Sequence, residues 1–135
     1  MKTAHLTTRE LAAYMDATNL RADATAADLQ ALCSDAAALH CAAVCLYPTD
    51  VAQAVEWLRG STTRVATVVG FPSGRFSLMA KEAEVAEAAR AGAHEVDIVM
   101  NYADLLAGRK AAVLKELTVL AEVAHNHGML SKIIV

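Results

Sequence analysis

The chain has 135 residues, of which 56% are hydrophobic, 20% charged and 4% aromatic, and its formal net charge is −3. This composition excludes a disordered chain, and the lack of a basic block argues against nucleic acid or an anionic membrane as a partner. No apolar run reaches the roughly 18 residues that would span a bilayer, and residues 1–5 show no signal-peptide core, so we expect a cytoplasmic protein.

The N-terminal part predicts a helix, a strand and a second helix. Residues 7–13 are expected to form a short helix capped by Thr7 or Thr8, and residues 14–20 a short strand. The next helix starts at the capping-box-like segment 25–28, and its apolar residues recur at intervals of three and four. These residues are Leu29, Leu32, Cys33, Ala36 and Leu39.

Two similar units follow. The continuous apolar run 42–48 ends in proline and predicts a strand buried on both faces, followed by a helix capped by residue 49 or 50 that continues through residue 58. The β-branched run 64–69 predicts another strand, which leads through the loop 70–74 into a helix over 78–91.

The last part predicts a strand over 95–101, a helix over 110–126 and a fifth strand beginning near Leu130. Alternation of short strands with helices is typical of βαβ units in a parallel sheet. The chain shows no linker or change of composition, so we expect residues 1–135 to form a single domain: an N-terminal helix, four strand–helix units and a fifth strand. Pro48 and Pro72 both lie just after predicted strands, at the edge of the sheet where parallel α/β folds build their sites.

Each predicted strand carries a polar or reactive residue that faces inward if the sheet curves into a barrel. These residues are Asp16, Thr18, Cys45, Tyr47, Thr67, Asp97 and Lys132. A buried aspartate without a partner is costly, so Asp97 predicts either a function or an ion pair with Lys132.

Simpler explanations exist for the same residues. Asp97 could be a structural carboxylate, Cys45 a small core residue, and Lys132 a lysine that reaches solvent from a strand end. The loop 70–74 could bind a phosphate or form a tight turn. The chain has three cysteines, an odd number without metal-ligand spacing, so we expect free thiols and no metal.

Several segments resemble the class I aldolase family of 2-deoxyribose-5-phosphate aldolase, in the family's order and over nearly the whole chain from about Leu11. They are Met15-Asp16-Ala17-Thr18-Asn19-Leu20, Ala43-Val44-Cys45-Leu46-Tyr47-Pro48, Val65-Ala66-Thr67-Val68-Val69-Gly70-Phe71-Pro72-Ser73-Gly74, Lys81-Glu82-Ala83-Glu84, Gly92-Ala93-His94-Glu95-Val96-Asp97-Ile98-Val99-Met100-Asn101-Tyr102 and Lys132-Ile133-Ile134.

The resemblance implies a (β/α)₈ barrel that reversibly joins acetaldehyde to glyceraldehyde 3-phosphate through a lysine Schiff base, without cofactor or metal, in deoxyribonucleotide catabolism. It implies a proton-relay role for Asp97 and a pocket lined by Asp16, Thr18 and Cys45, and Thr67 belongs to the same candidate pocket. Lys132 matches a family lysine that does not form the Schiff base. The family's Schiff-base lysine and phosphate-binding loops lie on strands six to eight, so the chain is expected to be a truncated barrel of strands one to five, inactive alone.

Three functions remain open from the sequence. The chain could be an N-terminal half of the aldolase that self-associates through its open sheet edges. It could be an assembled half-barrel with altered aldehyde chemistry at Lys132, or a non-enzymatic module that pairs with a separate C-terminal half. A small aldehyde or sugar phosphate is expected as the substrate only in the full family.

Overall fold

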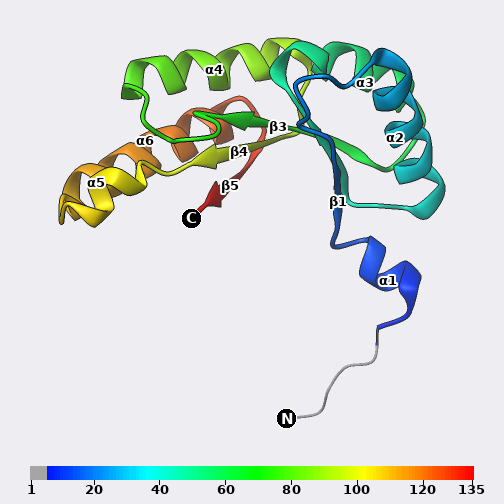
Figure 1. The fold of residues 1–135 in the computed structure, drawn as a ribbon, viewed down its shortest axis with the longest axis horizontal. Helices are drawn as coiled ribbons and strands as arrows, with labels where there is room; N and C mark the ends of the chain where they lie inside the picture. Colours follow the sequence, from blue (N-terminus) through cyan, green and yellow to red (C-terminus); the bar gives the residue numbers. More distant parts are fainter. Residues whose placement is uncertain (1–5) are drawn as a thin grey trace.

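The computed structural model describes residues 6–135, which contain a sheet of five parallel strands in the order β1-β2-β3-β4-β5 (Figure 1). The strands are β1 (Asp16–Thr18), β2 (Ala43–Leu46), β3 (Arg64–Val69), β4 (Glu95–Val99) and β5 (Leu130–Ile134). Each strand pairs with the strand that follows it in the chain. The parallel α/β fold is confirmed, and β1 and β5 are the two edges of the sheet.

Helices connect the strands. They are α1 (Thr8–Ala12), α2 (Ala26–Leu39), the 3₁₀ turn η1 (Pro48–Asp50), α3 (Val51–Trp57), α4 (Leu78–Ala91), α5 (Tyr102–Leu106) and α6 (Lys110–Asn126). The predicted bounds of α4 and α6 are confirmed. Within residues 6–135, none of the helices combines the length and the apolar character that a membrane crossing requires.

Local capping explains where several helices begin. Thr25 forms the complete capping box that its spacing to Asp28 predicts, and Thr7, one of the two expected caps of α1, forms a complete capping box with Glu10. Asp50 occupies the N-cap position of α3, as expected, but its side chain makes no capping bond, and a 3₁₀ turn that starts at Pro48 precedes the helix. Helix α5 was not predicted, and it begins where the Asn101 side chain accepts a hydrogen bond from the Asp104 amide.

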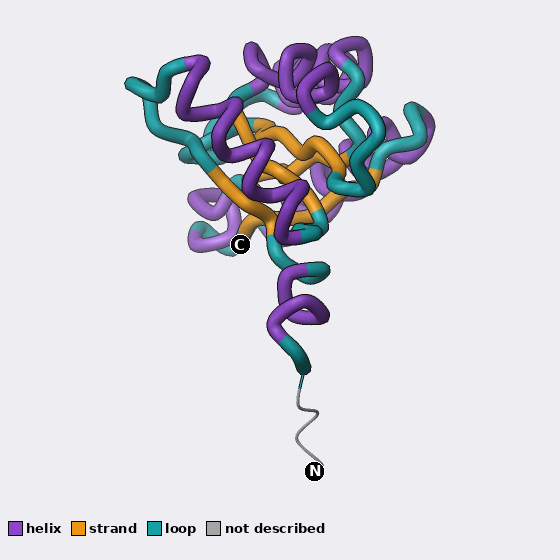
Figure 2. Tube along the Cα trace, turned by 90° about the vertical axis from the view of Figure 1, so that its right-hand side faces the viewer, coloured by secondary structure: helices purple, strands orange, loops and turns teal. Residues whose placement is uncertain are grey.

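The two faces of the sheet are covered differently. The outer face contributes Val44, Val65, Val96 and Ile98 to a large core that it shares with α2, α3, α4 and α6. In Figure 1, α2, α3 and α4 follow this side, and in Figure 2 α1 extends away from the strands and from the other helices. The opposite face, called the inner face below, carries a small cluster of Ala43, Cys45, Ala66 and Val68.

The sheet is strongly curved toward its inner face. Adjacent strands lie about 4.8 Å apart, so the edges of a flat five-stranded sheet would be separated by about 19 Å. The Lys132 ammonium on β5 nevertheless forms an ion pair with the Asp16 carboxylate on β1. A lysine side chain cannot cross a flat sheet of that width, so the two edge strands must curve toward one another.

The edge strand β5 exposes apolar side chains. Ile133 is 37% exposed and Ile134 39% exposed, although β-branched residues of the central strands, such as Val65 and Val96, are fully buried. The sheet is therefore less covered at β5 than at its centre.

Candidate functional site

The strand register collects polar side chains on the inner face. Asp16 lies beside Ala43 on the neighbouring strand, and Asp97 lies between Val68 on β3 and Lys132 on β5. Ala43 and Val68 belong to the inner-face cluster, so the carboxylates and the lysine share that side of the sheet.

Lys132 is surrounded by carboxylates. Its ammonium contacts Asp16, lies 3.1 Å from Glu95 Oε2 and lies 3.0 Å from Asp97 Oδ1. The Asp97 contact is an ion pair that lacks hydrogen-bond geometry. The predicted pairing of Asp97 with Lys132 is confirmed, in a cluster that also joins both edge strands. Three acids face one ammonium here, and Arg64, 3.3 Å from Glu95 Oε1, supplies a second cation.

These contacts determine the protonation of Lys132. Burial by itself lowers the pKa of an ammonium, but the hydrogen bond to Asp16 and the negative charges of Asp97 and Glu95 outweigh burial and raise the pKa of Lys132 above its ordinary value. The side chain therefore stays protonated at neutral pH. It can donate a hydrogen bond or a proton, but it is a poor nucleophile.

The Cys45 thiol lies on β2 beside the same group. Its Sγ is 3.6 Å from Asp97 Oδ2 and donates a hydrogen bond to it. Burial first, and then the Asp97 carboxylate, raise the pKa of Cys45 to about 12. The thiol is protonated at neutral pH, so it is a weak hydrogen-bond donor beside Asp97 and not a thiolate nucleophile.

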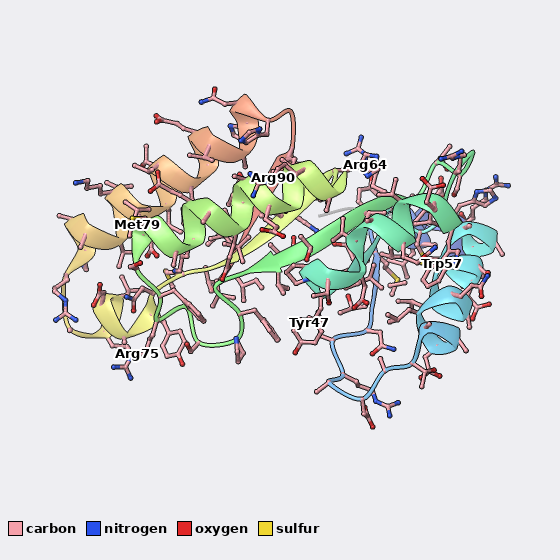
Figure 3. All side chains as sticks on the ribbon, turned by 90° about the horizontal axis from the view of Figure 1, so that it is seen from above. Tyr47, Trp57, Arg64, Arg75, Met79 and Arg90 are labelled. Carbon is pink, nitrogen blue, oxygen red and sulfur yellow. The ribbon has the colours of Figure 1, made fainter. Side chains whose placement is uncertain are left out.

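Two aromatic rings follow the ends of β2 and β3. Tyr47 and Phe71 pack edge to face with ring centroids 6.1 Å apart, and both contact the inner-face cluster. Figure 3 shows Tyr47 along the lower edge, among the loops that follow the strands, whereas Arg64 and Arg90 lie toward the opposite edge. Tyr47 and Phe71 thus lie near the carboxyl ends of the strands, where parallel barrels place their chemistry, whereas Asp16, Glu95 and Arg64 are the first residues of their strands.

The loop after β3 is a tight turn. The Gly74 amide donates to the Gly70 carbonyl oxygen at 2.7 Å. Gly74 has φ +67°, and a Cβ there would lie 2.1 Å from the Met100 carbonyl oxygen. Close approach to the backbone that follows β4, as well as positive φ, therefore requires glycine at this position.

The structure separates the two candidate threonines. Thr18 lies at the inner face beside Cys45, but it is exposed and its hydroxyl donates to the Asp16 carbonyl oxygen. Thr67 pairs in register with Leu46 and Val96 on the outer face, is fully buried, and donates to the Leu46 carbonyl oxygen. The prediction that Thr67 faces the interior is wrong, because the alternation of β3 turns it toward the helices.

Glu95 was missed as a member of this group. It is two residues before Asp97 on the same strand, so strand alternation alone places both on one face. Its side chain is 7% exposed and contacts both Lys132 and Arg64.

Across residues 6–135, His, Cys, Asp and Glu side chains form no group of three or more that is arranged to hold a metal ion.

Comparison with known proteins agrees with this architecture. The family model of the DeoC/LacD family aldolases matches residues 11–135. A deoxyribose-phosphate aldolase of Aciduliprofundum boonei is 39% identical over 127 residues, which cover 94% of this chain and 57% of that protein. The chain thus spans little more than half the length of this curated relative.

Solved structures give the same result. A Coccidioides immitis structure provisionally assigned as a deoxyribose-phosphate aldolase superposes with a TM-score of 0.90 at 30% identity, covering 97% of this chain and 51% of the other. The tetrameric deoxyribose phosphate aldolase of Aeropyrum pernix gives a TM-score of 0.84 at 26% identity, covering 94% of this chain and 53% of the other. The five strands correspond to part of a TIM barrel in these neighbours. The chain belongs to the DeoC/LacD family of aldolases.

Proposed function

We propose that this chain supplies the first five strands of a deoxyribose-phosphate aldolase site and has no aldolase activity by itself. The reaction is the reversible aldol joining of acetaldehyde and glyceraldehyde 3-phosphate through a lysine Schiff base. The set of three carboxylates around the Lys132 ammonium supports the proposal that this chain does not supply the Schiff-base lysine.

A Schiff base forms only from a neutral amine, so its lysine needs a lowered pKa. The carboxylates act on Lys132 in the opposite direction, which disfavours it as the nucleophile. Lys81 is fully buried in an ion pair with Glu116, where a substrate cannot reach it. The remaining lysines of the described part, Lys110 and Lys115, are exposed on α6, away from the inner face. The reactive amine is therefore expected from another part of a completed barrel.

The inner-face group is suited to proton transfer instead. Asp97 holds the Cys45 thiol with one oxygen and faces the Lys132 ammonium with the other. A carboxylate beside a protonated lysine can accept a proton from a substrate carbon or water and return it, which is the work of a general acid–base pair. We expect Asp16, Thr18 and Cys45 to line the substrate pocket around it.

Completion of the barrel requires a polypeptide that pairs with the edge strands. Unpaired parallel edges associate readily, and β5 already exposes Ile133 and Ile134. The Aeropyrum pernix aldolase is described as tetrameric. We expect this chain to self-associate, or to bind a polypeptide that carries the rest of the barrel, and light scattering on a sizing column distinguishes a defined complex from the monomer.

The function is tested by complementation. The chain is co-expressed with the C-terminal part of the Aciduliprofundum boonei relative that it does not match, and cleavage of 2-deoxyribose 5-phosphate is measured. We expect no cleavage by the chain alone and cleavage by the complex. Asp97→Asn should lower the rate of the complex by about 10²- to 10⁴-fold. Arg90→Met, which changes an exposed arginine paired with Glu87, is the matched control and should have no effect.

Two results would contradict the proposal: cleavage by the isolated chain at the rate of the complex, or full activity of Asp97→Asn. The possibility that Lys132 forms the Schiff base is tested by borohydride trapping with acetaldehyde. We expect Lys132→Met to be trapped as efficiently as the unchanged complex. Loss of trapping in that variant would instead identify Lys132 as the nucleophile.

A further inference from the structure

Lys81, on α4, is an unusual member of the helix layer. It is 0% exposed and is the largest of the fully buried side chains in the described part of the chain. Its ammonium donates to the Val99 carbonyl oxygen at 2.8 Å and forms an ion pair with Glu116 of α6, which is 9% exposed. One side chain therefore joins two helices to the end of β4.

The stem of Lys81 also supports the β3–α4 loop (residues 70–77). A Cβ on Gly70 would lie 2.7 Å from Lys81 Cε, so the loop begins directly against the lysine. The Gly70 amide donates at 2.6 Å to Glu84, one helical turn after Lys81. The start of the loop is thus held by packing from Lys81 and by a hydrogen bond from the same helix.

Both attachments lead to the inner-face site. Val99, whose carbonyl oxygen Lys81 binds, is two residues after Asp97 on β4. Phe71 follows Gly70, and it packs against Tyr47 and against the inner-face cluster that contains Cys45. The strand that carries Asp97 and the loop that carries Phe71 are therefore both in contact with one lysine, the strand through the ammonium and the loop through the stem.

Fold stability alone gives little reason for this pair. Replacing a buried ion pair by apolar residues of similar volume is often neutral or stabilising, because two charges lose their hydration on burial. A lysine that merely filled the space between α4 and α6 could be a methionine. The carbonyl bond to Val99 is what an apolar side chain cannot provide.

We infer that Lys81 and Glu116 are positioning residues that hold Asp97 and the β3–α4 loop in place around the inner-face site. The two residues do not touch the proposed reacting groups and act only through β4 and the loop. The functional part of this inference rests on the proposed aldolase role, whereas the positional part is measurable in the chain without any activity.

The test uses the double variant K81M/E116L, which removes both charges and keeps approximate volume. We expect its urea midpoint to equal or exceed that of the unchanged chain. Hydrogen exchange at the Gly70 and Gly74 amides should nevertheless accelerate by about tenfold or more, because the loop opens locally without global unfolding. Alkylation of Cys45, followed by peptide mass spectrometry, should accelerate similarly as the ring of Phe71 moves.

Arg90→Met, on the exposed side of the same helix, is the control and should change neither rate. Unchanged amide exchange and Cys45 alkylation in a folded K81M/E116L would overturn the inference. A variant that fails to fold would also overturn it, because the pair would then be a requirement of the fold. In the complemented enzyme the variant should lower kcat more than it raises KM. Faster exchange and alkylation, with no aldolase activity in any complex, would refute the proposed function and leave the positioning role intact.

Discussion

Replacement of Lys132 by methionine is the sharpest test of the inner-face cluster. The variant keeps most of the side-chain length and volume but removes the ammonium that Asp16, Asp97 and Glu95 share. The folded protein then holds three carboxylates close together, two of which have side chains only 7% and 14% exposed.

The expected cost follows from these contacts. Removing one partner of a fully buried pair costs about 3–5 kcal/mol, because an uncompensated charge stays buried. Lys132 keeps 33% of its side chain exposed, so solvent screening reduces the attraction, and Arg64 still faces Glu95. We therefore expect Lys132→Met to lower the free energy of unfolding by about 1–3 kcal/mol at pH 7.

The pH dependence identifies the cause. Crowded carboxylates make the folded variant bind protons more readily than the unfolded chain, so its free energy of unfolding falls as pH rises from about 4 to 7. The difference from the unchanged chain should therefore be small near pH 4 and largest near pH 7. Urea unfolding at several pH values measures it, with Arg90→Met as the exposed-pair control, expected to cost less than about 1 kcal/mol. A difference that is the same at pH 4 and pH 7 would refute the electrostatic reasoning and indicate lost packing.

Three further predictions concern separate parts of the chain. Gly74→Ala should lower the free energy of unfolding by more than about 2 kcal/mol, because the new Cβ would meet the Met100 backbone. Gly128→Ala is the control: this glycine has a similar positive φ but no atom within 4 Å of the new Cβ, so the cost should be only about 1 kcal/mol. Equal costs in thermal or urea unfolding would contradict the close approach at Gly74. The pKa of Cys45 is raised from 9.0 to about 12, so between these pH values the folded chain keeps a proton that the unfolded chain loses. The free energy of unfolding should therefore fall as pH rises from 9 to 12, and it should fall less in Cys45→Ala. Thr25→Ala removes a capping box and should cost about 1 kcal/mol in urea unfolding, and an unchanged midpoint would show that α2 does not depend on its cap.

Much of the fold was predictable from local pattern. The continuous apolar run that forms β2 and the β-branched run that forms β3 identified central strands, because only strands buried on both faces lack polar alternation. The C-terminal end of α4 was predictable from Gly92, which adopts the left-handed conformation that ends a helix. Helix α5 was not predicted because a segment of five residues is too short to show helical periodicity in its hydrophobic residues.

The site was predictable in composition but not in geometry. Strand alternation placed Asp97 and Lys132 on one face. The same alternation also places Glu95, two residues before Asp97, on that face, although Glu95 was not predicted as a site residue. Thr67 was assigned to the wrong face because its neighbours are buried on both sides, and a strand without polar alternation does not reveal which side its hydroxyl takes.

The sequence by itself determined the parallel α/β pattern, the capping of the main helices and the aldolase resemblance, because these depend on neighbours along the chain. Only the tertiary structure decided that Asp16 on the first strand meets Lys132 on the last, 116 residues later, since that contact depends on the curvature of the whole sheet. The same holds for the burial of Lys81 against Glu116, because nothing in either helix alone shows which faces meet. Side chains that approach one another through the packing of separate elements leave no local signal.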